Sequence, residues 1–340
     1  MKCIGFLTWR GSTWSLLAHV LPPSGDGLDA LEGQTVSTRV RTKPRFTRSA
    51  CACLLGLLAV STSPALPGPV RRLIRTGLRT NLYVACGVMS LGAWVARTEG
   101  LDLSTTSLVV LGCGTLFIYN LDHLRDDQAR MQRDPRARPR LSARARVLLL
   151  VLALLGLTAA FVLGPPPLLL SALPAGLIGL AYGAGDAGRR LKDLPGAKSW
   201  LVAAAVSQAV LLVPRAGTLS HMAPSVATAS SAALLFILCA LNAHCFDLRD
   251  VETDAAAGAT TWATRLGSEG ASQQLHLAAW TGATVASVAS IAGVLPWGGA
   301  ATLVVAALSL RALRPNADSE RFGLLVDGWL FVPLLTTLVP

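Results

Sequence analysis

From residue 80 to its end, the chain alternates between long apolar runs and short polar segments. A helix needs about 17–25 mostly apolar residues to cross a bilayer. Nine runs reach or approach that length, which predicts an all-α polytopic membrane protein with nine transmembrane helices. The runs cover residues 80–96, 103–121, 145–164, 166–183, 199–214, 223–246, 272–294, 297–313 and 322–339.

The composition agrees with this pattern, since 52% of the residues are hydrophobic and only 14% are charged. A soluble domain usually carries about 25% charged residues. Lys and Arg are strongly biased between the two sides of the predicted helices: 21 lie on one side, and only Arg97 and Arg215 lie on the other. Basic loops stay in the cytoplasm, so the N-terminus is predicted to be cytoplasmic. The net charge of +11 is therefore explained by basic residues in cytoplasmic loops. The predicted partner is membrane lipid, and no nucleic-acid partner is predicted.

Residues 1–70 have a different character from the rest. They are rich in Gly, Ser, Thr and Pro, and their apolar run at 50–60 is too short to span a bilayer. We interpret them as a leader, either disordered, or a transit peptide, or a signal or anchor segment, or the product of a mis-assigned start. Residues 71–340 then form the nine-helix domain.

Two aspartate pairs occur where an apolar run meets the basic side. Asp122 and Asp126 follow the second run, and Asp250 and Asp254 follow the sixth. Acids four residues apart share one face of a helix. Carboxylates at the end of a membrane helix are costly there and usually functional. If the pairs face each other, they provide oxygen ligands for Mg²⁺ and, through the metal, a site for a diphosphate.

The second pair belongs to a longer pattern that resembles the second aspartate motif of the UbiA superfamily of intramembrane prenyltransferases, in particular its menaquinone-type branch. That motif runs R-D-x-x-x-D, then G-K-x-T-L-A, then a short stretch to a glycine. Ala259 stands where the family usually has lysine. The matching positions are Arg249, Asp250, Asp254, Gly258, Thr261, Ala263 and Gly267.

The first pair resembles the first motif of the same family, N-D-x-x-D-x-x-x-D, with a shifted register. Counted from Asn120, the family's acids would fall on apolar or amide side chains, namely Leu121, Leu124 and Gln128. A shift of two residues brings in Asp122 and Asp126 instead. The loop between the fourth and fifth runs resembles the family's tyrosine and basic cluster, with Tyr182, Arg189, Arg190, Lys192 and Lys198. Arg138 matches a basic element after the first motif.

The resemblance implies a UbiA-like bundle and a Mg²⁺-dependent transfer of a prenyl group from an allylic prenyl diphosphate to a hydrophobic aromatic or lipid-like acceptor, as in quinone biosynthesis. It implies that Asp122, Asp126, Asp250 and Asp254 are the catalytic and metal-binding residues. The implied diphosphate-binding residues are Asn120, Arg138, Tyr182, Arg189, Arg190, Lys192, Asp247 and Arg249.

The implied location is a bacterial inner membrane with the site facing the cytoplasm, or an organellar membrane if the leader is a transit peptide. A terpene cyclase of the same type and a non-catalytic or transport protein on the same scaffold are the alternatives. The neighbouring acids Asp127 and Glu252 are predicted to be solvated loop residues.

Overall fold

The computed structural model describes residues 3–10, 13–20, 68–133, 141–185, 190–194, 196–217, 226–256, 258–313 and 319–338. The chain divides into two compact units, Met1–Arg48 and Ser49–Pro340. In the first unit, β1 (Cys3–Arg10) pairs antiparallel with β2 (Thr13–Val20), with Cys3 opposite Val20. Among the described residues, this hairpin departs from the predicted all-α fold class. The assignment of residues 1–70 as a leader stays a prediction.

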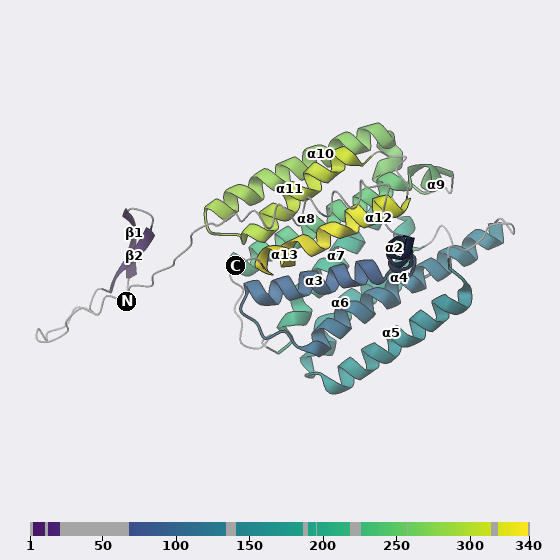
Figure 1. Cartoon of the computed structure of the whole chain (residues 1–340), viewed down its shortest axis with the longest axis horizontal. Helices are drawn as coiled ribbons and strands as arrows, with labels where there is room; N and C mark the ends of the chain where they lie inside the picture. Colours follow the sequence, from purple (N-terminus) through teal and green to yellow (C-terminus); the bar gives the residue numbers. More distant parts are fainter. Residues whose placement is uncertain are drawn as a thin grey trace, which may run out of the picture. The chain divides into compact units, whose positions relative to one another are not determined.

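The second unit is helical, and within the described residues each of the nine apolar runs overlaps a helix (Figure 1). The last run consists of α12, a 3-10 turn at Trp329–Phe331, and α13. The helices are α2 (Gly68–Arg79), α3 (Leu82–Thr98), α4 (Thr105–Arg133), α5 (Ala143–Leu163), α6 (Pro167–Tyr182), α7 (Ala197–Leu212), α8 (Val226–Arg249), α9 (Val251–Ala256), α10 (Trp262–Ile291), α11 (Trp297–Ala312), α12 (Ser319–Gly328) and α13 (Val332–Leu338).

Several of these helices have the length and composition of membrane spans. Among the described residues, four are long and apolar enough to cross a membrane: Thr105–Gln132, Ala143–Leu163, Ala197–Arg215 and Thr228–Arg249. The helices Leu82–Thr98, Pro167–Tyr182, Trp297–Arg311 and Phe322–Leu338 are apolar but shorter. The chain is therefore an integral membrane protein with a helical membrane fold.

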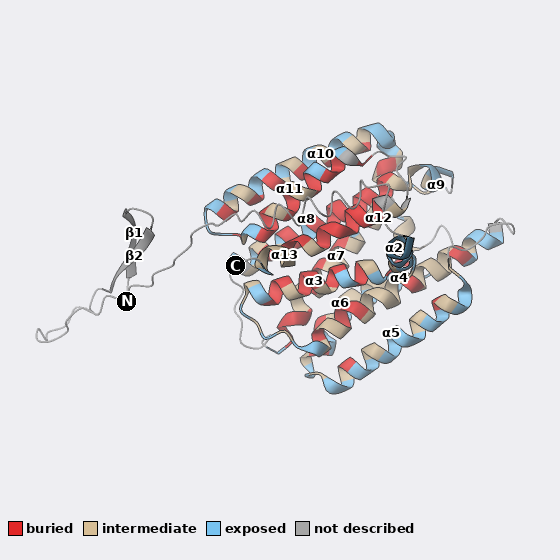
Figure 2. Cartoon of the chain, viewed as in Figure 1, coloured by how far each residue is buried: buried red, intermediate tan, exposed pale blue. Residues whose placement is uncertain are grey.

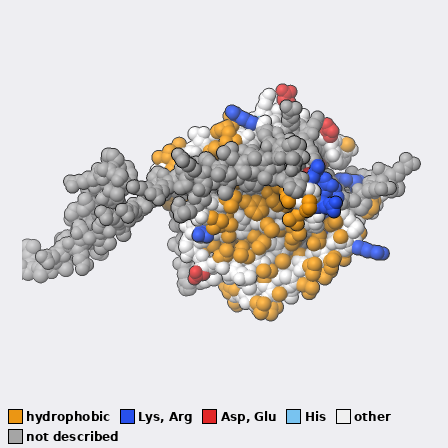
Figure 3. Space-filling model, viewed as in Figure 1, with side chains coloured by type: hydrophobic (Ala, Val, Ile, Leu, Met, Phe, Trp, Pro, Cys, Tyr) orange, Lys and Arg blue, Asp and Glu red, His pale blue; other side chains and the backbone are white. Residues whose placement is uncertain are grey.

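The outer surface of the helical unit is as apolar as lipid contact requires. On α5, Leu148, Leu155 and Val162 are exposed, and on α10 Leu277 and Ile291 are exposed. Hydrophobic side chains cover much of the visible face in Figure 3. In water such a surface would be a large apolar patch, whereas in a bilayer it contacts acyl chains at little cost.

The centre of the bundle is closely packed around α8, whose residues are mostly buried (Figure 2). Small residues let the neighbouring helices approach, as is typical of membrane bundles. Ala203 on α7, together with Ala271, Ala279 and Ala283 on α10, is fully or almost fully buried. The pairs α4 with α5, α7 with α8, and α10 with α11 lie side by side (Figure 1).

The helix boundaries at the second motif follow from its sequence. Gly258 and Gly267 both have φ of +72°, a left-handed conformation that glycine adopts without strain. Thr261 caps the start of α10, since its hydroxyl accepts a hydrogen bond from the backbone N–H of Thr264 at 3.1 Å. Gly258 and Thr261 thus shape the turn between α9 and α10, Gly267 kinks α10, and none of the three lines the site.

Candidate active site

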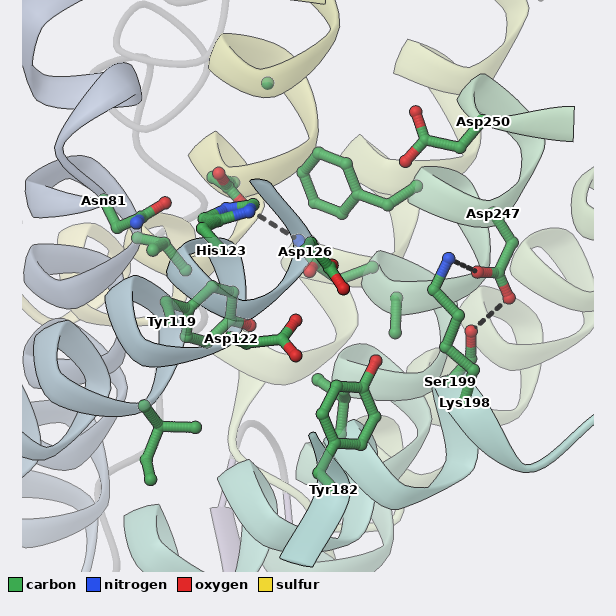
Figure 4. Close-up of a pocket in the computed structure, with 18 of the residues that line it drawn as sticks. Asn81, Tyr119, Asp122, His123, Asp126, Tyr182, Lys198, Ser199, Asp247 and Asp250 are labelled. Carbon is green, nitrogen blue, oxygen red and sulfur yellow. Dashed lines mark hydrogen bonds and ion pairs between the residues drawn. The ribbon is translucent and has the colours of Figure 1, made fainter. Parts of the chain in front are cut away.

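Both aspartate pairs line one cavity of about 670 Å³ inside the helical unit. Asp122 and Asp126 reach it from α4, Asp250 from the residue after α8, and Asp254 from α9. Figure 4 shows Asp122 and Asp126 on one side of this space and Asp247 with Lys198 on the other. Helices far apart in sequence therefore bring the predicted acids together, which agrees with the expectation that the pairs face each other.

The first pair converges on a single ammonium group. Lys192 Nζ lies 2.5 Å from Asp122 Oδ1 and 2.8 Å from both carboxylate oxygens of Asp126. Both acids lie on α4, which continues past the apolar run to Arg133. One helix face thus presents two carboxylates that can bind the same cation.

A second basic residue, Arg190, strengthens this side of the site. Its guanidinium contacts Asp126 Oδ1 at 2.7 Å and also binds Asp193. Burial opposes the charge of Arg190, but the hydrogen bonds to Asp193 and Asp126 raise the pKa of its guanidinium above the ordinary value. Arg190 therefore stays cationic at any working pH.

The second pair is arranged differently from the prediction. Lys198 Nζ lies 3.1 Å from Asp254 Oδ2 and 3.1 Å from Asp247 Oδ1, so Asp254 shares its cation with Asp247. Asp250 instead pairs with the neighbouring Arg249, at 2.7 Å. The acid that shares a cation with Asp254 is thus Asp247, which was predicted only as a diphosphate-binding residue.

Asp247 and Asp254 differ in their surroundings. Asp247 is almost fully buried and also accepts a hydrogen bond from Ser199 Oγ. Burial raises the pKa of the Asp254 carboxyl above its ordinary value, and the Lys198 ammonium offsets part of that rise. A second cation at this point would hold the carboxylate ionised more firmly.

The remaining predicted residues fall into three groups. Tyr182 and Arg249 line the cavity, and Lys192 Nζ lies 5.4 Å from the centre of the Tyr182 ring. Asn120 does not line it, because its amide donates to the backbone carbonyls of Thr80 and Leu116 between helices. The structure thus gives Asn120 a packing role. Arg138 and Arg189 lie outside the described residues.

The aspartate carboxylates of the cavity are oxygen ligands of the kind that Mg²⁺ prefers. In the structure, the ammonium groups of Lys192 and Lys198 lie between these carboxylates, where a metal ion would bind. Among the described residues there is no group of three or more His, Cys, Asp and Glu side chains that could hold a metal ion. Asp122 and Asp126 nevertheless converge on Lys192 Nζ, and Asp247 and Asp254 converge on Lys198 Nζ, all within hydrogen-bonding distance. Hard oxygen ligands that meet at one point suit Mg²⁺, which keeps water and phosphate oxygens as its other ligands.

Sequence reasoning missed several contributors to the site. Lys198 belongs to the basic cluster, but its bridge between Asp247 and Asp254 depends on the packing of α7 against α8. Asp127 was predicted to be solvated, and this was wrong. It is buried, lines the cavity and pairs with Arg146 of α5 at 2.9 Å. The sequence did not single out this pair, because Arg146 ends a series of arginines that were interpreted together as the positive charge of a cytoplasmic loop.

Gly183, directly after Tyr182, gives a sharp test of how Asp122 is positioned. A Cβ at Gly183 would lie 2.7 Å from Asp122 Oδ1. We expect Gly183→Ala to push this carboxylate off its position and to lower turnover by roughly tenfold to a hundredfold, since a small misplacement of a catalytic group has that size of effect. Stability should change little, because the obstructing atom ends a movable side chain. Diphosphate release and thermal unfolding measure the two effects.

Gly176→Ala is the matched control for this variant. Gly176 lies in α6, the helix that ends just before Gly183, and a Cβ there meets no atom within 4 Å. This control should keep wild-type turnover. Equal turnover in Gly183→Ala and Gly176→Ala would contradict a working role for the Asp122 carboxylate in its observed position.

The fold and the cavity together define a class of protein: a helical membrane protein whose bundle encloses a site lined by acidic and basic side chains. The sequence profile of the UbiA prenyltransferase family matches residues 85–321, so the chain belongs to that family. No curated protein matches the sequence.

Solved structures share the fold. A UbiA homolog from Archaeoglobus fulgidus bound to GPP and Mg²⁺ aligns with a TM-score of 0.52 at 15% identity, over 77% of this chain and 99% of that one. The same homolog bound to DMAPP and Mg²⁺ aligns with a TM-score of 0.51 at 15% identity, over 78% and 99% of the two chains. The apo structure of a UbiA homolog from Aeropyrum pernix K1 gives 0.54 at 13% identity, over 76% and 98%.

Proposed function

We propose that this protein is a Mg²⁺-dependent intramembrane prenyltransferase, a transferase of alkyl groups other than methyl. It would take an allylic prenyl diphosphate, release diphosphate, and join the prenyl group to an aromatic or lipid-like acceptor, as in quinone biosynthesis. The observation that carries this proposal is the meeting of two carboxylate pairs in one cavity that also contains basic side chains. The UbiA homolog from Archaeoglobus fulgidus bound to GPP or DMAPP with Mg²⁺ supports the substrate class.

The roles of the side chains follow from their charges. In this proposal Asp122 and Asp126 hold one Mg²⁺, and Asp250 and Asp254, together with Asp247, hold another. When bound, Mg²⁺ acts as a Lewis acid that stabilises the departing diphosphate. Lys192 and Arg190 now neutralise the first acids, and they would turn to the phosphate oxygens as the metal takes their place.

The rest of the cavity would protect the allylic carbocation. Its inner wall carries apolar side chains, among them Ile118, Ile178, Val202 and Val206. Such a wall excludes water, which would otherwise capture the cation. The prenyl tail would lie along this wall or pass between helices into lipid.

We propose nine membrane crossings with a cytoplasmic N-terminus, in a bacterial inner membrane. The bias of basic residues to one side supports this topology. The aspartate pairs then open to the cytoplasm, where soluble prenyl diphosphates are available. Labelling of single cysteines placed at Arg97 and Arg265 would test it, since the two positions should report opposite sides.

The direct test is release of diphosphate from GPP by the purified full-length protein. With Mg²⁺ we expect release, and with EDTA we expect none, because the leaving group then lacks its counter-charge. Without an added acceptor, a transferase passes the prenyl group to water and gives geraniol, whereas a cyclase gives a cyclic product. With an acceptor present, the transferase gives a prenylated acceptor. Release that persists unchanged in EDTA would contradict the proposed metal dependence.

A further inference from the structure

The cavity contains a third acidic element that belongs to neither aspartate motif. Asp327 lies on α12 and lines the same cavity as Asp122 and Asp254. It is 7% exposed, in a helix that is otherwise apolar at this level. An acid at such a position in a membrane protein is expensive to bury and is generally retained for function.

Asp327 lies deeper in the bundle than the diphosphate side of the cavity. Its oxygen Oδ1 is 3.4 Å from the amide of Asn242 on α8. Asn242 comes five residues before Asp247, which places it about 7.5 Å further from the basic side along the helix. Asp327 therefore marks the inner part of the cavity, beyond the acids proposed to bind metal.

The contacts of Asp327 leave a strong hydrogen-bonding capacity directed at the cavity. The amide of Asn242 donates a shorter hydrogen bond, 3.0 Å, to the backbone carbonyl of Val326, so its contact with the carboxylate is the weaker one. A carboxylate can accept about four hydrogen bonds, and one long amide contact does not offset its burial.

Tyr119 links the two levels of the cavity. It lies on α4 three residues before Asp122, which places it about 4.5 Å further from the basic side along the helix, and it lines the cavity. A substrate pair that extends from the metal-binding acids to Asp327 would therefore pass Tyr119. Prenyl transfer needs this arrangement, in which the allylic carbon lies near the diphosphate and the acceptor lies beside it, deeper in the cavity.

We propose that Asp327, positioned by Asn242, forms the acceptor subsite and accepts a hydrogen bond from a hydroxyl group of the acceptor. This inference rests on the proposed prenyl transfer. A neutral hydroxyl supplies a second donor beside the long contact from Asn242, whereas an ether or a bare hydrocarbon supplies none. The subsite thus selects acceptors that carry a hydroxyl group.

The test compares two probes, 1-naphthol and its methyl ether, which differ in one hydrogen-bond donor. Full-length protein in lipid nanodiscs is incubated with Mg²⁺ and GPP, and prenylated product and diphosphate are measured separately. We expect the wild type to favour 1-naphthol in kcat/KM by roughly tenfold to a hundredfold, the effect of a hydrogen bond to a charged group. In Asp327→Asn this preference should fall to near unity through a raised KM for 1-naphthol.

Without any probe, water takes the prenyl group and gives geraniol and diphosphate. This basal release should stay near the wild-type rate in Asp327→Asn, because the metal-binding acids are intact. Glu320→Gln is the matched control. It makes the same chemical change on α12 nearer the basic side, and it should keep the preference. Asn242→Ala should lose part of the preference, and it provides the test if Asp327→Asn does not fold.

The possible outcomes separate the inference from the proposed function. A wild type that releases no diphosphate overturns the proposed function itself. A wild type that releases diphosphate but uses the two probes equally, or uses neither, overturns the acceptor subsite. Retention of the preference in both Asp327→Asn and Asn242→Ala overturns it as well.

Discussion

Replacement of Asp254 by alanine should reduce Mg²⁺-dependent diphosphate release by about a hundredfold to a thousandfold, the size of effect seen when one stabilising contact to a developing negative charge is removed. The variant removes a carboxylate that lines the cavity and leaves Lys198 paired with Asp247 alone. One proposed metal then has a weaker site, and the leaving diphosphate loses part of its counter-charge. The measurement is the rate of diphosphate release from GPP with saturating Mg²⁺.

Glu252→Gln is the control for this prediction. Glu252 lies in the same short helix, α9, and is exposed, and it is not among the residues that line the cavity. It should keep at least half of the wild-type rate with unchanged thermal unfolding. Asp122→Ala should fall as far as Asp254→Ala, since both pairs serve one diphosphate. If Asp254→Ala and Asp122→Ala both turn over at the wild-type rate, the enzyme hypothesis fails.

The helical framework was predictable because lipid imposes a simple rule on sequence. Each backbone group inside the bilayer must be hydrogen-bonded within its own helix, so long apolar runs become helices. The run at 145–164 corresponds to α5 within two residues at each end, and the run at 103–121 begins within two residues of the start of α4. The ends were less predictable, because α4 continues through polar residues to Arg133 as one helix.

The acids at the site were also predictable, since their spacing alone places Asp122 and Asp126 on one face. Their partners were not. That Lys198 joins Asp254 to Asp247 follows from how α7, α8 and α9 pack, and no local pattern contains that information. Asp327 has no neighbouring motif, and only its burial beside Asn242 singles it out. A single acid in an apolar run was the available sequence signal for it.

Asn120 shows that a residue at a motif position can have different contacts from those that the motif implies. It occupies the first position of a family-like pattern, but its side chain faces the carbonyl of Thr80, away from the cavity. Asp122 and Asp126 each lie two residues before a family acid position, which rotates the working face of α4 by about 200° relative to the family register. The structure thus favours the shifted register, in which Asp122 and Asp126 line the cavity.

The buried pair of Asp127 and Arg146 leads to a prediction about stability. Asp127 Oδ2 accepts a hydrogen bond from Arg146 Nη2 at 2.9 Å, and the Arg146 side chain is only 3% exposed. Asp127→Ala leaves that guanidinium buried without its acid. We expect the free energy of unfolding to fall by about 3–5 kcal/mol, the usual effect of removing one partner from a buried ion pair. Thermal unfolding in detergent, with the midpoint compared to wild type, measures it.

The matched control is a more exposed ion pair at the basic side of the helical unit. Arg75 and Glu320 lie 2.5 Å apart, with side chains 39% and 27% exposed, so Glu320→Ala should cost about 0–1 kcal/mol. The double variant Asp127→Leu with Arg146→Met should recover much of the stability, because an apolar pair needs no counter-charge. Equal midpoints for Asp127→Ala and Glu320→Ala would show that the pair between α4 and α5 does not hold these helices together.

The same variant also tests the register of the first motif. Asp127 follows Asp126 by about 100° around α4 and points to Arg146, whereas Asp126 points to Lys192. Diphosphate release per folded molecule should therefore change little in Asp127→Ala, while it falls sharply in Asp122→Ala. The reverse result, an inactive folded Asp127→Ala beside an active Asp122→Ala, would transfer the metal-binding role to Asp127. It would also mean that Lys192 marks the position of a structural ion pair and not that of a metal.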